Sequence, residues 1–133
     1  MFEAMQELEA ICAGLAAKRL TLLARAELEA AQRECLAAAE AGDRSRYLKA
    51  NEAFHSAIYR ATQNPYVAEM AADFRRRTGP FRAKKFGTTA DLVASARSHD
   101  GLLETIFSSD AGVARRGMID HMRRSYLDTL AAH

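Results

Sequence analysis

Apolar side chains recur every three or four positions along most of the chain, which is the spacing of one face of an α-helix. No segment of useful length shows the strict alternation of a β-strand. The pattern therefore predicts one all-α domain over residues 1–133, with short connectors that favour antiparallel neighbours. The expected helices cover residues 2–18, 21–41, 43–64, 65–80, 89–106 and 110–130.

Side chains that accept hydrogen bonds from free backbone N–H groups predict where these helices begin. Thr21, Thr89 and Asp110 are the expected N-caps of the second, fifth and sixth helices, and either Asp43 or Ser45 caps the third. The stretch between residues 80 and 88 is expected to be irregular, with a short helical continuation through residue 81 left open. The positions expected to face the core are Leu8, Ile11, Cys12, Leu15, Tyr47, Asn51, Phe54, Ile58, Val67, Met70, Ala71, Phe74, Leu92, Ala96, His99, Leu103, Ile106, Ile119, Met122, Tyr126 and Leu130.

Composition supports this interpretation and narrows the class of protein. The 133 residues fit one domain with one core, and hydrophobic residues make up 49% of them. Cys12 and Cys35 lack a CxxC partner, so buried free thiols in a reducing cytoplasm are expected. No apolar run is long enough to cross a membrane.

Charge is nearly balanced, with a net charge of +2 at pH 7. One short segment is locally basic, and its cations are Arg75, Arg76, Arg77, Arg82, Lys84 and Lys85. Such a cluster can contact phosphates, but a solvated helix end explains it more simply, because cations favour the C-terminal end of the helix dipole.

Three histidines fall on the apolar faces of three different predicted helices. They are His55, His99 and His121. Asn51 lies one helical turn before His55, so both side chains share one face. Taken singly, each of the four residues reads as a hydrogen-bonded core residue. Taken together, three imidazoles and an amide oxygen make a candidate site for a divalent metal, with zinc or nickel favoured.

A di-iron carboxylate centre is excluded by the same spacing. Glu52 and His55 form one E-x-x-H pair, and that type of centre needs a second pair from another helix. Ala96 and Met118 occupy the positions three residues before His99 and His121. The second half of the pattern is therefore missing.

The chain resembles the FCD domain, the C-terminal effector-binding domain of the FadR subgroup of GntR transcription regulators. The resemblance begins with Leu8-Glu9 followed by Ala16-Ala17, and covers essentially the whole chain. Its later parts are Asn51-x-x-Phe54-His55, Ser95-x-x-x-His99-x-x-Leu102-Leu103-x-x-Ile106, and then Asp110, Ala114, Met118 and His121.

This resemblance implies an antiparallel bundle of six or seven helices around a central cavity, in a homodimeric cytoplasmic regulator. It also implies a divalent metal held by Asn51, His55, His99 and His121, with a small carboxylate effector at or near the metal. DNA binding in the family belongs to a winged helix-turn-helix that precedes this domain. Nothing in the chain resembles that part, so the chain is expected to be either a piece of a regulator or a stand-alone relative.

Two positions depart from the family pattern. Asn51 stands where an aspartate is usual, which removes a negative charge and should weaken the metal or shift its preference. Met5 stands where an effector-binding arginine is common. Arg75, Arg77 and Arg82 are alternative candidates for a carboxylate clamp, because guanidinium binds carboxylates in bidentate fashion. Exposed helix-end charge is the simpler explanation for each of them singly. Ser95 is also taken as a candidate effector contact.

Two alternatives stay open at this point. A metal-dependent hydrolase would use the same histidines to activate water, but neither Glu52, Asp100 nor Glu104 falls on an inward row as a general base. A helical dimerisation module that has lost its ligand would explain the departures at Asn51 and Met5. The sequence therefore favours a regulatory, non-enzymatic sensor domain.

Overall fold

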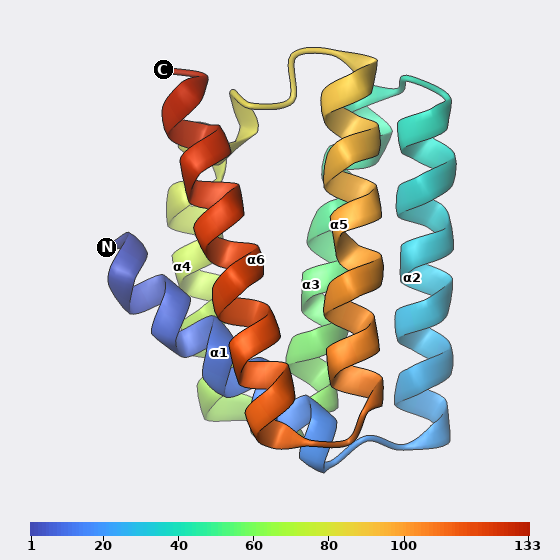
Figure 1. Cartoon of the computed structure of the whole chain (residues 1–133), viewed down its shortest axis with the longest axis vertical. Helices are drawn as coiled ribbons and strands as arrows, with labels where there is room; N and C mark the ends of the chain where they lie inside the picture. Colours follow the sequence, from blue (N-terminus) through green and yellow to red (C-terminus); the bar gives the residue numbers. More distant parts are fainter.

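The computed structural model describes all of residues 1–133 and contains six α-helices and no strand (Figure 1). The predicted all-α class is therefore confirmed. The helices are α1 (Phe2–Lys18), α2 (Leu22–Glu40), α3 (Arg44–Ala61), α4 (Pro65–Ala83), α5 (Thr89–Phe107) and α6 (Ala111–Ala131).

Helix starts follow the capping side chains closely. Thr21, Asp43 and Asp110 accept hydrogen bonds from backbone N–H groups three residues ahead, as expected of N-caps. The prediction for α5 was wrong by one residue, because Thr88 and not Thr89 caps this helix. Thr88 has the extended backbone of a cap and forms a reciprocal capping box with the third residue of the helix.

Helix α4 runs past the point where the sequence predicts its end. It continues through Pro80 to Ala83, although proline removes one backbone hydrogen bond. Side chains hold this last turn in place: Arg82 donates from Nε to the hydroxyl of Thr78 at 2.9 Å, and from Nη2 to the carbonyl of Arg75 at 2.8 Å. The irregular segment is therefore confined to residues 84–88.

The six helices form two groups that lie side by side (Figure 1). Helices α2, α3 and α5 pack on one another, and α1 crosses obliquely against α4 and α6. The connector of residues 84–88 passes from the top of α4 to the top of α5, and so bridges the two groups (Figure 1). Residues 84–87 of this connector and residues of α3, α4, α5 and α6 line one pocket.

The core differs from the predicted stripes at three helices. On α1 the fully buried residues include Met5 and Cys12, whereas Leu8 and Ile11 are only partly buried, so the inward face is rotated from the expected stripe. The core predictions for three other apolar residues were wrong, because these residues lie outside the part of each helix that its neighbours bury. These are Met70, Tyr126 and Leu130, which are 55%, 38% and 46% exposed.

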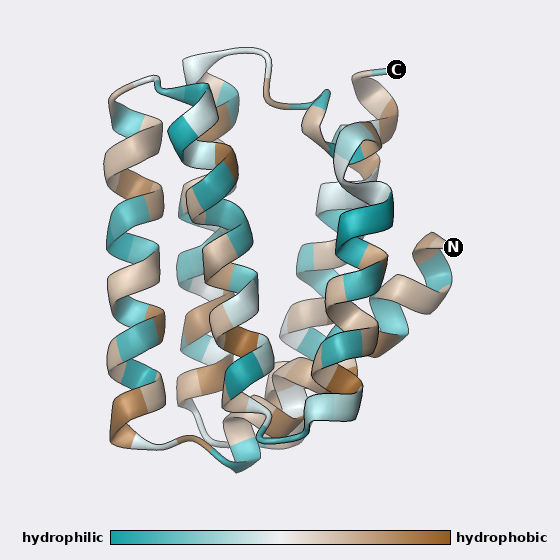
Figure 2. Cartoon of the chain, turned by 180° about the vertical axis from the view of Figure 1, so that it is seen from behind, coloured by the Kyte–Doolittle hydropathy of each residue, from teal (hydrophilic) through white to brown (hydrophobic).

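Small side chains let the helices approach closely. A Cβ built on Gly117 of α6 would lie 2.5 Å from Thr105 Oγ1 of α5, so only glycine fits at this crossing. Cys12 and Cys35 are buried and free, and burial raises the pKa of each thiol to about 12. Seen from behind, hydrophobic and hydrophilic positions are mixed along every helix, and no helix is long and apolar enough to span a membrane (Figure 2).

Candidate metal centre

Three histidines from three helices converge at one place in the bundle. His55 comes from α3, His99 from α5 and His121 from α6. Their ring centroids are 5.8 to 6.0 Å apart, and one nitrogen from each ring lies within 4.8 Å of the others. We call these three residues the histidine cluster. This convergence makes the cluster a candidate site for one shared ion.

His99 is held by contacts on two sides of its ring. The ring of Phe54 stacks on it, with centroids 4.0 Å apart and planes inclined by 6°. Its Nδ1 lies 2.9 Å from the amide oxygen of Gln32 on α2. These contacts fix the ring plane and occupy one nitrogen, so Nε2 is the atom that His99 can offer to the cluster.

His55 lies next to the buried carboxylate of Glu9. Its Nδ1 lies 4.0 Å from Oε2 of Glu9, and neither atom has a hydrogen-bond partner. The other oxygen of Glu9 accepts a hydrogen bond from the hydroxyl of Tyr59. Burial raises the pKa of Glu9, and the charge of Arg75 opposes this effect.

Asn51 contributes an oxygen without a partner. Its Oδ1 is buried and makes no hydrogen bond, and the residue lines the same pocket as the histidine cluster. An unsatisfied buried acceptor costs about 1–3 kcal/mol. Such an oxygen on the same face as His55, one helical turn before it, is what a fourth metal ligand requires. The residues present therefore fit a divalent ion held by three nitrogens and one oxygen.

The electrostatic surroundings keep all three rings neutral at pH 7. Burial lowers the pKa of His55 and of His99 well below 6.5, and nearby cations and the other rings add to the effect. Burial and the neighbouring charge of Lys85 lower the pKa of His121 to about 3. Neutral imidazole is the form that coordinates metals, so no proton has to be displaced from the ligand atoms.

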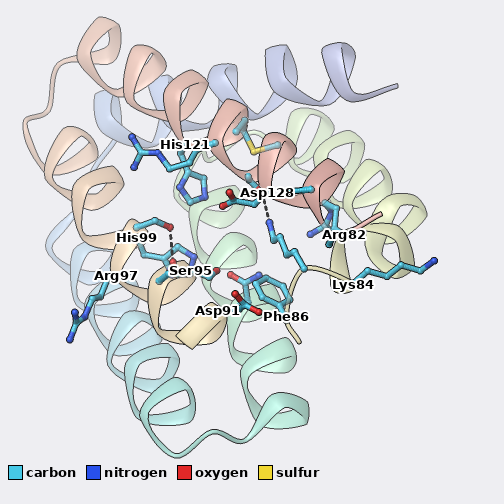
Figure 3. Close-up of a pocket in the computed structure, with 18 of the residues that line it drawn as sticks. Arg82, Lys84, Phe86, Asp91, Ser95, Arg97, His99, His121 and Asp128 are labelled. Atoms are coloured by element: carbon cyan, nitrogen blue, oxygen red, sulfur yellow. Dashed lines mark hydrogen bonds between the residues drawn. The ribbon is translucent and has the colours of Figure 1, made fainter. Parts of the chain in front are cut away.

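The histidine cluster forms one wall of a pocket of about 880 Å³. Figure 3 shows His99 and Ser95 extending from α5, His121 and Asp128 from α6, and Arg82 from α4. Arg97 and Lys84 extend away from the pocket centre in the same view. The pocket therefore combines an uncharged nitrogen-rich wall with a rim of mixed charges.

Two of the three candidate arginines are buried at this pocket. Arg75 forms a two-pronged ion pair with Glu52, with both N–O distances 3.1 Å, and its Nη1 lies 3.9 Å from Glu9. Arg82 Nη2 lies 3.6 Å from the same carboxylate of Glu52. Burial raises the pKa of Glu52, but the two arginines outweigh it and the pKa lies below its usual value. We call Glu9, Glu52, Arg75 and Arg82 the arginine network.

Arg77 lies outside the pocket. Two positions along a helix turn a side chain by about 200°, so Arg77 is opposite to Arg75 on α4. It is exposed and pairs with Asp73 at 3.7 Å. The simpler sequence interpretation, a solvated charge, describes Arg77, whereas Arg75 and Arg82 are turned inward from the same basic segment.

Ser95 lines the pocket and accepts a hydrogen bond from the hydroxyl of Tyr47 at 2.7 Å. Sequence reasoning missed several neighbours of the site, including Glu9, Gln32 and Lys85. A signal was present for two of them: Glu9 and Gln32 lie at helical spacing from buried residues of their own helices, such as Cys12 and Cys35. Neither residue was predicted to face the core, because both side chains are polar.

A bundle of helices with a polar pocket walled by histidines is a ligand-binding architecture. The FCD domain family model matches residues 1–124, and the chain therefore belongs to the FCD family, the effector-binding domains of GntR-family transcription regulators. The family assignment identifies the chain as a regulatory domain, and the metal-dependent hydrolase considered from the sequence is not supported. The McbR/YncC protein of E. coli has the same fold, with a TM-score of 0.88 at 24% sequence identity. The match covers 98% of this chain and 66% of that one. No curated protein matches the sequence.

Proposed function

We propose that this domain senses a small organic acid at a divalent metal ion. The proposal is carried by one observation: three ligand nitrogens within 4.8 Å of one another share a pocket with an unpartnered amide oxygen. His55, His99, His121 and Asn51 would hold the metal, and zinc or nickel suits this set. Four protein ligands leave two positions open on a six-coordinate ion such as nickel, and one position on zinc when it expands to five ligands, for an effector or water.

Charge around the site supports an anionic effector. Every proposed ligand is uncharged, so a bound divalent ion keeps its full charge. The cations nearest to the cluster include Arg75 and Lys85, and both lower the pKa of the histidines. A carboxylate would offset this accumulated positive charge and could contact Arg82 and Ser95 at the pocket wall.

Effector binding would act on the regulator by joining elements from both helix groups. The proposed ligands come from α3, α5 and α6, and the arginines come from α4. An ion and an acid that contact all four helices favour the conformation in which these helices lie closest together. We propose that this change is read by a second copy of the chain in a homodimer and by a DNA-binding domain in the whole regulator.

The test uses untagged protein loaded with zinc and a panel of mono-, di- and tricarboxylates. A binding acid at 100 times its Kd should add about 2.7 kcal/mol to the stability, which raises Tm by roughly 10 °C for a chain of this size. The same acid should have little effect on metal-free protein. If the protein takes up no metal and no acid raises Tm, the domain is a dimerisation module without a ligand and the proposal fails.

A further inference from the structure

Gln32 contacts the histidine cluster from a helix that contributes nothing to the pocket lining. It lies on α2, is 4% exposed, and contacts His99 without lining the pocket itself. Its amide makes three hydrogen bonds. Nε2 donates to the carbonyl oxygen of Ala96 at 2.7 Å and to Asp100 Oδ1 at 3.0 Å, and Oε1 lies 2.9 Å from His99 Nδ1.

These three contacts determine the orientation of the amide. A backbone carbonyl and a carboxylate oxygen only accept hydrogen bonds, so the NH₂ group of Gln32 must face Ala96 and Asp100. The reversed amide would place its oxygen against two acceptors. The oxygen of Gln32 therefore faces His99, and because it is itself only an acceptor, Nδ1 of His99 must carry the hydrogen.

A neutral imidazole carries a hydrogen on only one nitrogen. With Nδ1 protonated, the lone pair of His99 is on Nε2. The stacked ring of Phe54 holds the imidazole plane. Turning the ring over within this plane would place the Cδ2–H carbon where Nδ1 meets the Gln32 oxygen, and the hydrogen bond would be lost. Metal-binding histidines commonly have such a partner on the second nitrogen, which fixes the tautomer and raises ligand basicity.

We propose that Gln32 is a positioning residue that locks His99 in the Nδ1–H tautomer and so makes Nε2 its ligand atom. The tautomer is a property of the metal-free chain, whereas the effect on metal affinity rests on the function proposed above. The two parts can be tested separately. Asp100 takes part because its carboxylate, together with the carbonyl of Ala96, sets the direction of the amide.

The first experiment is ¹H–¹⁵N NMR of the imidazole nitrogens in metal-free protein, with the His99 signals identified by their loss in His99→Ala. Wild type should show the Nδ1–H tautomer. Gln32→Met removes the acceptor and should shift the ring toward Nε2–H. Arg33→Met, an exposed neighbour on α2, is the matched control and should resemble wild type. An Nε2–H signal in wild type overturns the proposal without any variant.

The second experiment measures zinc affinity by competition with a chelator. Gln32→Met should weaken zinc binding about 10- to 100-fold, as loss of an outer partner of a ligating histidine typically does, and Arg33→Met should not. Equal affinities in wild type and Gln32→Met overturn the positioning role. If wild type binds no zinc, the proposed metal function fails, while the NMR result still decides the tautomer.

Discussion

Two buried polar regions lie next to each other in this domain, and they differ in how their polar groups are satisfied. In the arginine network, Arg75 and Arg82 offset the charges of Glu9 and Glu52. Arg82 also donates hydrogen bonds to Thr78 and to the carbonyl of Arg75. In the histidine cluster, no ring bonds to another, and the nearby Asn51 oxygen has no partner. The first region keeps one atom without a partner, Glu9 Oε2, but its charges are paired within the protein. The second region has no partner in the protein for the Asn51 oxygen or for His55 Nδ1.

The two regions should therefore respond in opposite ways to a change in their charges. A buried ion network with paired charges contributes little net stability, but removing one member leaves a buried charge without compensation. An incomplete cluster of neutral ligands costs stability when it must accept protons, and gains stability when it accepts a metal. Acid, metal and single substitutions can separate these behaviours.

Acid should produce the largest effect, through the histidine cluster. The pKa values of the three rings are lowered in the folded chain, while the unfolded chain binds protons below pH 6.5. Stability of the metal-free protein therefore falls as pH falls below about 6.5, by up to about 1.4 kcal/mol per pH unit for each ring. Glu9, with its raised pKa, acts in the opposite direction but is one group against three.

Urea unfolding in the presence of a chelator, from pH 7.5 to pH 5, measures this slope. His133→Gln is the matched control, because His133 is exposed at the end of the chain and does not belong to the histidine cluster. A stability that does not change with pH in this range would show that the rings accept protons in the folded chain, and the cluster would then not be a set of neutral ligands.

Removing the central cation of the arginine network should have the next largest effect. Arg75→Met leaves the buried Glu9 carboxylate without its cation, and breaking a buried ion pair in this way costs about 3–5 kcal/mol. Arg77→Met, on the exposed side of the same helix, should change stability by less than about 0.5 kcal/mol. Chemical denaturation of the metal-free proteins at pH 7 distinguishes the two. Similar stabilities would mean that the network is dispensable.

Loss of one ligand should abolish tight metal binding with less damage to the fold. His121→Ala should weaken zinc binding more than about 100-fold, since loss of an outer partner alone costs 10- to 100-fold. His121 is only partly buried, so the metal-free variant should keep its circular dichroism spectrum and cooperative unfolding. His133→Ala is the control and should bind zinc as wild type does. A fold that collapses in His121→Ala would make the cluster structural.

Restoring a charged oxygen at position 51 should have the smallest effect, and its sign should depend on the metal. Asn51→Asp should tighten zinc binding about tenfold, or about 1.4 kcal/mol, because a carboxylate attracts the ion. The same variant should be less stable than wild type without metal, because it buries an unpaired charge. Asn64→Asp, which keeps the N-cap of α4, is the matched control for both measurements. Unchanged zinc affinity would place residue 51 outside the coordination sphere.

Much of the fold could be predicted from local sequence. Helical spacing and capping side chains indicated the six helices, because both signals act within a few residues. The end of α4 was missed, since the bonds from Arg82 that hold it past Pro80 depend on a burial that no local rule gives. The exposure of Met70 was missed for the same reason: spacing gives a face, but the neighbouring helices decide how wide the buried part is.

The site could be predicted only in part. The histidines were found because an imidazole on the apolar face of a helix is unusual, and a shared metal ion explains three such residues together. Their partners Glu9 and Gln32 were not found, because a polar residue at a core-facing helical position does not reveal which group on another helix it contacts. Their roles arise from contacts between α1 and α3 and between α2 and α5. Long-range pairing of polar groups is therefore the information that the structure adds.

The histidine cluster and Asn51 are proposed to form an incomplete site that a divalent ion completes, and the other proposals depend on this one. Its most direct test is calorimetric titration of untagged, metal-free protein with zinc at pH 7. We expect one ion bound per chain, with fewer protons released than thiol ligands would give because the rings are already neutral. No binding, or binding that survives replacement of both His99 and His121 by alanine, would contradict the proposed site.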